Sequence, residues 1–264
     1  MIYASYSMLK DYGECKKKAY YHLIKEPKPE TASLISGRVI HDMIDQYEKG
    51  YDGDLLSNYH KTLAKELSKD GIEFYRYQTV PKFLEWMDKC FTNYVEISRQ
   101  LPRILETEKR FSIPYYEDSS IAPDTNVVGI FDQIREGDVV CELKTGKRKP
   151  DDEFLRADLQ ATVYIWAYEI LYDKVPLYYY IHLPSGNVYQ LERSNFDHFH
   201  DMVNDFIQTY TEENWTKERD GRKCNWCWYN KPCLETSEVG RHLFKAVGTT
   251  KTRRNSESTS FLEY

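Results

Sequence analysis

The pattern of apolar and polar positions divides the chain into helical and strand-like segments. Helix-type patterns, with apolar residues on one face, occupy residues 5–22, 33–48, 54–100, 152–172 and 196–213. The third is expected to break near Asp70 and Gly71 and to end before Pro102. Strand-type patterns occupy residues 107–115, 126–134, 139–144, 177–183 and 188–192. This order predicts an α/β fold with a mixed central sheet flanked by helices.

The same pattern suggests one domain with an added segment. The 264 residues suffice for a single substantial core, so we expect one domain over residues 1–235 with a helical insertion at 50–102. Residues 236–264 are rich in Ser, Thr, Lys and Arg, which predicts a flexible tail. No stretch approaches ~18 consecutive apolar residues, and the first residues lack a signal-peptide core. We therefore expect a cytoplasmic protein with no membrane partner.

Charge limits how the chain could bind nucleic acid. Lys and Arg total 36 and Asp and Glu total 42, so the formal net charge is −6. That balance argues against a protein that coats nucleic acid through a basic surface. It is compatible with an enzyme that grips a few phosphates and uses carboxylates to hold a metal ion. Some of the 23 Tyr could stack on unpaired bases, although packing at the edges of the core is their more common role.

Two acidic residues and a lysine lie on neighbouring predicted strands. Side chains alternate along a strand, so Glu142 and Lys144 share one face of the strand 139–144. Asp132 joins that face only if the numbers of facing residues sum to 274, as 132 and 142 do. This register needs an odd-length connection, such as the three residues 136–138. A two-residue turn would place the carboxylates on opposite faces of the hairpin.

In the required register the two carboxylates could hold one cation. Directly opposed Cβ atoms lie ~5 Å apart, and carboxylate oxygens suit Mg²⁺ or Mn²⁺. Such an ion polarises a phosphate and lowers the pKa of a bound water. Lys144 could orient that water or neutralise charge in the transition state. The alternative is a surface hairpin with ordinary charges, which these three residues alone do not exclude.

Helical positions on either side of the hairpin add candidates. Gln160 and Tyr164 are four residues apart, so they project from the same face of the predicted helix 152–172. His41 shares a face of the helix 33–48 with Gly37, and a neutral imidazole could add a metal ligand. Each of these has an ordinary structural alternative: a helix-surface pair and a core histidine.

Together these elements resemble the RecB-like branch of the PD-(D/E)xK nuclease family. The matches, in chain order, are G-x-x-x-H at 37–41, G-x-x-D-x-I at 129–134, E-x-K-T at 142–145 and Q-x-x-x-Y at 160–164. The sequence departs from the family at two points: Glu142 stands where many relatives have Asp, and no Pro precedes Asp132. The resemblance implies a restriction-endonuclease-like fold and a DNA exonuclease acting at or near single-stranded ends.

The resemblance also implies roles for particular residues. The implied ligands of Mg²⁺ or Mn²⁺ are His41, Asp132, Glu142 and the backbone carbonyl of Leu143. The implied catalytic group is Asp132, Glu142, Lys144, Gln160 and Tyr164. Glu108, on the preceding strand, could assist.

The rival interpretation is a non-catalytic DNA-binding or scaffold module that retains the fold. Such a module would have no chemical reason to keep the acidic pair together with its lysine. The chain lacks the G-x-x-x-x-G-K-[ST] helicase signature. We therefore expect it to act in DNA repair or recombination, alone or beside a separate helicase or a CRISPR-type partner.

Three of the six cysteines form a cluster, C-x₂-C-x₅-C, near the C-terminus. In a reducing compartment clustered cysteines favour metal ligation, and Cys15 is the best candidate for a fourth ligand. The pattern resembles the iron–sulfur staple of RecB-like nucleases, including AddB and CRISPR-associated exonucleases. There a [4Fe–4S] cluster joins the two chain ends. The implied ligands are Cys15, Cys224, Cys227 and Cys233. Zinc and unligated thiols are the alternatives, while Cys90 and Cys141 are expected in the core.

Overall fold

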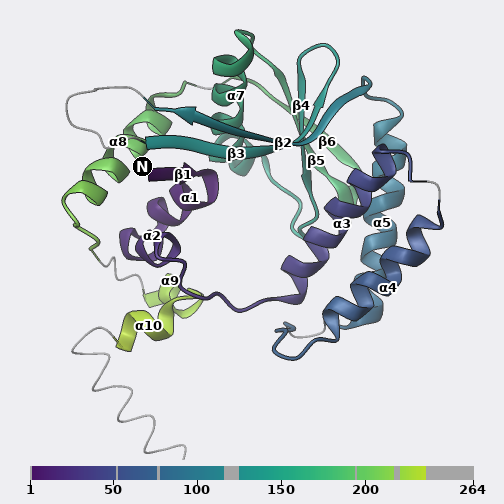
Figure 1. The fold of residues 1–264 in the computed structure, drawn as a ribbon, viewed down its shortest axis with the longest axis horizontal. Helices are drawn as coiled ribbons and strands as arrows, with labels where there is room; N and C mark the ends of the chain where they lie inside the picture. Colours follow the sequence, from purple (N-terminus) through teal and green to yellow (C-terminus); the bar gives the residue numbers. More distant parts are fainter. Residues whose placement is uncertain are drawn as a thin grey trace, which may run out of the picture. The chain divides into compact units, whose positions relative to one another are not determined.

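The computed structural model describes residues 2–51, 53–75, 78–115, 125–193, 195–216 and 221–235 (Figure 1). They belong to two compact units, one formed by residues 1–10 and 29–214 and the other by residues 11–28 and 215–264. The expected tail, residues 236–264, lies outside the described residues. Within the described ranges, no helix is long and apolar enough to cross a membrane.

The larger unit contains the predicted mixed sheet, to which its described residues contribute six strands. They are β1 Ile2–Ser5, β2 Ile104–Pro114, β3 Thr125–Arg135, β4 Val139–Lys144, β5 Leu177–His182 and β6 Asn187–Leu191. The order is β1-β3-β4-β5-β6, and β2 pairs with β3 outside this path. The pairs β1–β3 and β4–β5 are parallel and the others antiparallel. The sequence does not reveal β1, because four residues are too few to show an alternation.

Two strands, β1 and β4, pair with different parts of the same edge of β3. The stretch of β3 between them borders the candidate site. β1 pairs with residues 125–128 and β4 with residues 133–135, so residues 129–132 lie between the two partners. β2 pairs along nearly the whole of β3 and must therefore occupy the opposite edge. The β3–β4 register is the predicted one, because its pairs 133/141, 134/140 and 135/139 each sum to 274. The three-residue turn 136–138 separates the strands, with Gly137 at φ +76°.

Helices cover both faces of the sheet (Figure 1). On one face, α3 Ala32–Glu48, α4 Leu55–Leu67 and α5 Val80–Ser98 form a continuous apolar core with Val139, Cys141 and Leu143 of β4. On the other face lie α7 Leu159–Tyr172 and α8 Asp197–Thr211. The alternation along β4 therefore buries residues 139, 141 and 143 in the helical core and leaves Glu142 on the α7 side.

Two predicted helices are each divided in the structure. The segment 5–22 forms α1 Tyr6–Glu14 and α2 Lys16–Leu23, and the segment 152–172 forms α6 Asp152–Arg156 and α7. At each break one residue has extended backbone: Cys15 at φ −171° and ψ 121°, and Asp158 at φ −70° and ψ 99°. The Asp158 side chain accepts from the Gln160 N–H, which makes it the N-cap of α7. These caps are local polar signals that an apolar periodicity does not detect.

In the smaller unit the N-terminal and C-terminal segments of the chain pack together. The C-terminal segment contributes α9 Gly221–Asn225 and α10 Asn230–Glu235. The Lys17 N–H donates to the Thr216 carbonyl at 3.1 Å, and the rings of Tyr21 and Tyr229 stack with centroids 5.3 Å apart. Backbone and aromatic contacts thus join the segment 11–28 to the described part of the C-terminal segment.

Gly129 of β3 has no room for a side chain. An added Cβ would lie 2.4 Å from Cζ of Phe111, whose ring packs against Phe131 and Tyr164 at centroid distances of 4.8 and 5.7 Å. We expect Gly129→Ala to lower the free energy of unfolding by about 1–3 kcal/mol through overpacking, measured by urea denaturation. Gly146→Ala is the control, since its Cβ would meet nothing within 4 Å. Equal stability of the two variants would contradict this account.

Candidate active site

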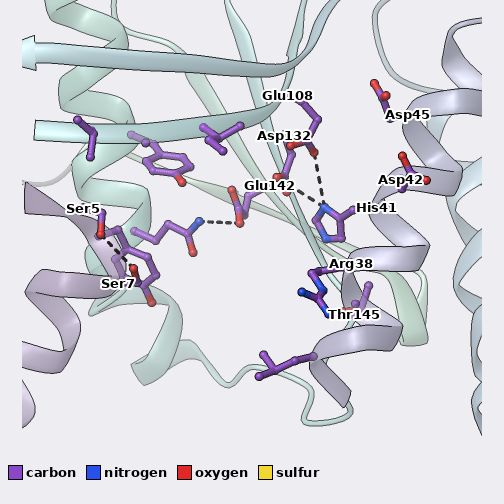
Figure 2. A pocket seen from close by; sticks show the side chains of 18 of the residues that line it. Ser5, Ser7, Arg38, His41, Asp42, Asp45, Glu108, Asp132, Glu142 and Thr145 are labelled. Atoms are coloured by element: carbon purple, nitrogen blue, oxygen red, sulfur yellow. Dashed lines mark hydrogen bonds and ion pairs between the residues drawn. The ribbon is translucent and has the colours of Figure 1, made fainter. Parts of the chain in front are cut away.

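The gap beside β3 opens into a cleft of about 730 Å³ within the larger unit (Figure 2). Its walls come from the β1–α1 junction, one face of α3, the edge of β3, and the start of α7. Five of the lining residues are acidic: Asp42, Asp45, Glu108, Asp132 and Glu142. So many carboxylates around one cleft repel one another unless cations or protons lie among them.

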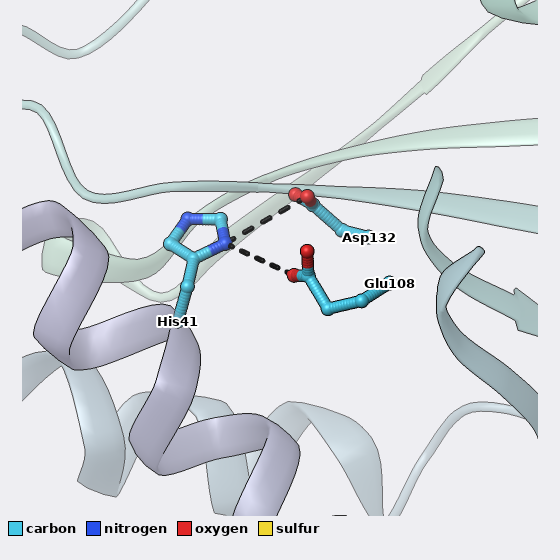
Figure 3. A group of neighbouring side chains, drawn as sticks. All are labelled: His41, Glu108 and Asp132. Atoms are coloured by element: carbon cyan, nitrogen blue, oxygen red, sulfur yellow. Dashed lines mark ion pairs between the residues drawn. The ribbon is translucent and has the colours of Figure 1, made fainter. Parts of the chain in front are cut away.

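His41 lies between two of these carboxylates. Its Nδ1 is 3.7 Å from Oδ1 of Asp132 and 3.9 Å from Oε1 of Glu108 (Figure 3). One ligand atom from each of the three residues falls within 4.8 Å of the others. An imidazole nitrogen with two carboxylate oxygens is a donor set suited to Mn²⁺ or Mg²⁺ when water completes the shell. These three residues could therefore hold a divalent cation.

Glu108 reaches this position through the pairing of β2 with β3. The pairs 107/133 and 109/131 flank it, and its carboxylate comes within 4.8 Å of the ligand atoms of His41 and Asp132. Directly opposed like charges destabilise a sheet, and Glu108 also has a φ of +49°, which is uncommon for a residue with a side chain. Strain of this kind gathers at functional sites. A cation between the two carboxylates would remove their repulsion.

Only one of the two carboxylate oxygens of Glu142 accepts hydrogen bonds from the described residues. Its Oε1 accepts from Lys144 Nζ at 2.7 Å and from Gln160 Nε2 at 2.6 Å. Its Oε2 is buried and has no hydrogen-bond partner among the described residues. A buried carboxylate oxygen without a partner is costly, so this atom is the one that fits a cation. The Gln160 Oε1 also accepts from Lys144 Nζ, at 2.6 Å, which closes a three-membered network.

The pKa values of these groups follow from burial and from mutual repulsion. Burial, with the Asp132 charge added, raises the pKa of Glu142 to about 7, and burial raises the pKa of Asp132 as well. Burial lowers the pKa of His41, but Asp132, Glu108 and Glu142 outweigh it and raise that pKa to about 9. The cleft thus retains protons where its carboxylates crowd. Cation binding would displace them, because metal ligands must be deprotonated.

Gln160 and Tyr164 are buried, with 6% and 7% of their surfaces exposed. Burial raises the pKa of Tyr164, and the Glu142 and Asp132 charges raise it further. Its ring meets Phe111 and Phe131 edge-on, so it packs in the core rather than offering a stacking surface. Both residues line the cleft, and Gln160 contacts Glu142 and Lys144 directly.

Leu143 contacts the site through its backbone. Its N–H donates to Asp132 Oδ2 at 2.7 Å, which fixes that carboxylate against β4. The role of the Leu143 carbonyl as a metal ligand stays a prediction.

Other lining residues were missed from the sequence. Asp45 could have been found, because residues 38, 41 and 45 follow helical spacing on one face of α3. Tyr6 could not, because nothing in the helix pattern of residues 5–22 relates it to the hairpin. It nevertheless lines the cleft, and burial with the Asp158 charge raises its pKa to about 12.

The four cysteines of the predicted cluster all belong to the smaller unit. Burial raises the pKa of the Cys227 thiol, and the nearby thiols of Cys15 and Cys233 raise it further. Cys224 lies one turn before Cys227, whose N–H donates to its carbonyl at 3.2 Å. In the described part of the chain, however, only His41, Glu108 and Asp132 come within metal-ligand distance of one another. The cysteines therefore do not form a closed ligand set.

The two remaining cysteines are packed in the core, as predicted. Cys90 and Cys141 are fully buried and belong to the cluster formed by α3, α4, α5 and the sheet. Burial raises the pKa of each thiol to about 12, so both are chemically quiet.

Comparisons with known proteins agree with this geometry. Residues 3–234 match the family model described as PD-(D/E)XK nuclease superfamily. The sequence matches no curated protein. A solved structure of a candidate exonuclease from Eubacterium rectale is 12% identical, with a TM-score of 0.49 over 80% of this chain and 79% of that one. The structure of SSO0001 is 13% identical, with a TM-score of 0.37 over 85% and 92%. At these values neither structure contributes to the assignment.

Gln160 supplies a test of the site that needs no substrate. Gln160→Ala removes a donor to Glu142 and an acceptor from Lys144, so both side chains lose their fixed orientation. We expect Mn²⁺ affinity to fall about 10- to 100-fold, as for other residues that orient metal ligands, in calorimetric titrations. Ile170→Ala, at an exposed position of the same helix, should leave the affinity unchanged. Equal Mn²⁺ affinity in both variants would show that Gln160 does not position the site.

Proposed function

Because this chain belongs to the PD-(D/E)XK nuclease superfamily, we propose that it is a metal-dependent DNA exonuclease of the RecB-like type. The proposed reaction is hydrolysis of phosphodiester bonds at or near single-stranded ends. One observation carries the proposal: His41, Glu108 and Asp132 converge in one cleft with the unpartnered oxygen of Glu142. Mg²⁺ or Mn²⁺ is the cation that this oxygen-rich donor set favours.

The donor set fits a divalent ion on two separate grounds. Three ligand atoms already lie within 4.8 Å of one another, and Glu142 Oε2 lacks any other partner among the described residues. The residues that would hold the ion are His41, Asp132 and Glu142, with Glu108 and the Leu143 carbonyl as further candidates. A bound ion would supply Lewis-acid polarisation of the phosphate and an activated water.

Lys144 contributes a fixed positive charge. Burial lowers its pKa, but Glu142 and Asp132 outweigh this and raise it, so the ammonium group stays protonated. Glu142 and Gln160 hold it at 2.7 and 2.6 Å. A charge held in place before the reaction stabilises a developing phosphoryl charge without reorganisation. Lys144 therefore acts on the transition state, and Gln160 positions it.

The acidic residues that follow His41 on α3 support binding of a strand end rather than a continuous strand. Asp42 accepts from the Tyr59 hydroxyl at 2.6 Å, and Asp45 accepts from the Thr107 hydroxyl at 2.5 Å, so both carboxylates are fixed. A phosphate backbone running past them would meet like charge. A strand end would not, and this favours exonuclease over endonuclease action.

A non-catalytic DNA-binding module is the second candidate. It would account for the fold but not for a cleft-lining carboxylate, Glu142, with one oxygen held by Lys144 and the other without a partner among the described residues. A motor protein or recombination partner would supply strand separation, for which the sequence carries no helicase signature.

We expect Asp132→Asn and Lys144→Ala each to reduce cleavage at least about 100-fold while the protein stays folded. The measurement is Mg²⁺-dependent nucleotide release from labelled single-stranded oligonucleotides. Arg103→Ala, which breaks an exposed ion pair with Glu136, is the control and should keep full activity. Circular single strands should resist cleavage. Full activity in both site variants would overturn the assignment, and cutting of circles would contradict the end preference.

We further propose that Cys15, Cys224, Cys227 and Cys233 hold a [4Fe–4S] cluster, with zinc as the alternative. Support comes from the packing of residues 11–28 against residues 215–235 in the smaller unit, which contains all four cysteines. A cluster linking residue 15 to residues 224–233 would close a very long loop and stabilise the fold. Its proposed role is structural.

Cys227→Ser tests this cluster. We expect anaerobically purified wild-type protein to be coloured and to contain iron and sulfide, and the variant to lose both colour and thermal stability. Cys90→Ala changes a core thiol instead, and it should keep the colour. A colourless wild-type protein that contains stoichiometric zinc would favour the alternative. An unchanged spectrum and melting temperature in Cys227→Ser would refute any metal at these cysteines.

A further inference from the structure

We propose that Arg38 and Lys147 form a phosphate-binding rim at one end of the cleft. The rim would hold the nucleic-acid backbone next to the phosphate that is cleaved. This inference rests on the proposed function. It names the residues that would bind the substrate strand, and the side of the metal site from which the strand would enter.

Charge changes sign along the face of α3 that borders the cleft. Arg38, His41 and Asp45 follow one another at helical spacing on this face, and all three line the cleft. Arg38 is the only Lys or Arg among the described lining residues. Seven residues of helix span ~10 Å, so the cleft runs from a positive end, past His41, to a negative end. Asp45 is paired with Lys49 at 2.6 Å, and Asp42 keeps the second end acidic, so a polyanion is attracted to the first end.

Lys147 lies on the loop that follows Lys144, and Thr145 of this loop lies next to α3 at Gly37, the neighbour of Arg38. A Cβ added at Gly37 would lie 3.2 Å from Thr145 Oγ1, so α3 closely approaches the loop that follows Lys144. Figure 2 shows Arg38 and Thr145 side by side below His41. The indole N–H of Trp86 donates to the Thr145 carbonyl at 3.0 Å, and Lys147 Nζ lies 5.6 Å from the centre of the Trp86 ring system.

Arg38 is available to a phosphate. Its side chain is 65% exposed and donates to Glu30, itself 54% exposed, at 2.7 Å. An exposed ion pair contributes little stability, so a phosphate can take the place of the Glu30 carboxylate. The guanidinium group binds both anions with the same forked geometry. Arg38 stands one helical turn from His41, a Cβ separation of ~5–6 Å, so it would bind a phosphate adjacent to the metal.

Salt dependence of binding tests the rim directly. We would measure the affinity of the Asp132→Asn chain for a fluorescent single-stranded oligonucleotide in Mg²⁺ over a range of salt concentrations. Adding Arg38→Ala or Lys147→Ala should each lower the slope of log K against log salt by ~0.7, the value for one lost single-strand phosphate contact. Arg103→Ala removes the same charge from an exposed ion pair outside the cleft and should leave the slope unchanged.

Glu30→Gln provides a test of opposite sign. It removes the carboxylate that competes with phosphate for Arg38, so binding should become tighter. The rim is overturned if Arg38→Ala and Arg103→Ala give the same slope, if Glu30→Gln binds no more tightly, or if the Asp132→Asn chain binds no oligonucleotide at low salt. If one of these results is obtained and the wild-type chain still cleaves DNA, the rim is refuted and the proposed function stands. A wild-type chain that does not cleave DNA refutes the proposed function itself.

Discussion

Repulsion among carboxylates crowded around one cleft is the constraint around which this protein is organised. The carboxylates of Asp132 and Glu108 approach one another from two paired strands. Glu142 joins them from a third strand with one oxygen that lacks a hydrogen-bond partner among the described residues. A sheet gains nothing in stability from such an arrangement. It persists because β3 is held by β2 along one edge and by β1 and β4 at the two ends of the other. The structure thus imposes a charge arrangement that a divalent cation would relieve.

The surroundings of the cleft keep this arrangement in place. The residues of β4 that point away from the cleft, Val139, Cys141 and Leu143, anchor the strand in the core built by α3, α4 and α5. On the cleft side, Gln160 links Glu142 to Lys144, and the Leu143 N–H fixes Asp132. Each catalytic candidate is therefore tied to a packed element, which is the condition for a site held before its substrate arrives.

Much of this site could be predicted from the sequence because it depends on local periodicity. The alternation in 139–144 and the three-residue turn determine which face carries Glu142, and helical spacing brings Gln160 and Tyr164 to that face. Other features depend on contacts between distant segments. β1 is too short to be recognised and pairs only with residues 125–128. Glu108 enters the site through its pairing with β3, and Tyr6 through the end of β1. The helix breaks at Cys15 and Asp158 depend on the backbone of single capping residues.

Anomalous diffraction from crystals soaked in Mn²⁺ tests the central claim most directly. The account predicts a peak within coordination distance of the Asp132 and Glu142 carboxylates, with Glu142 contributing Oε2 and the imidazole of His41 turned toward the ion. A cleft that takes no Mn²⁺ under these conditions, or Asp132 and Glu142 side chains on opposite faces of the sheet, would contradict it.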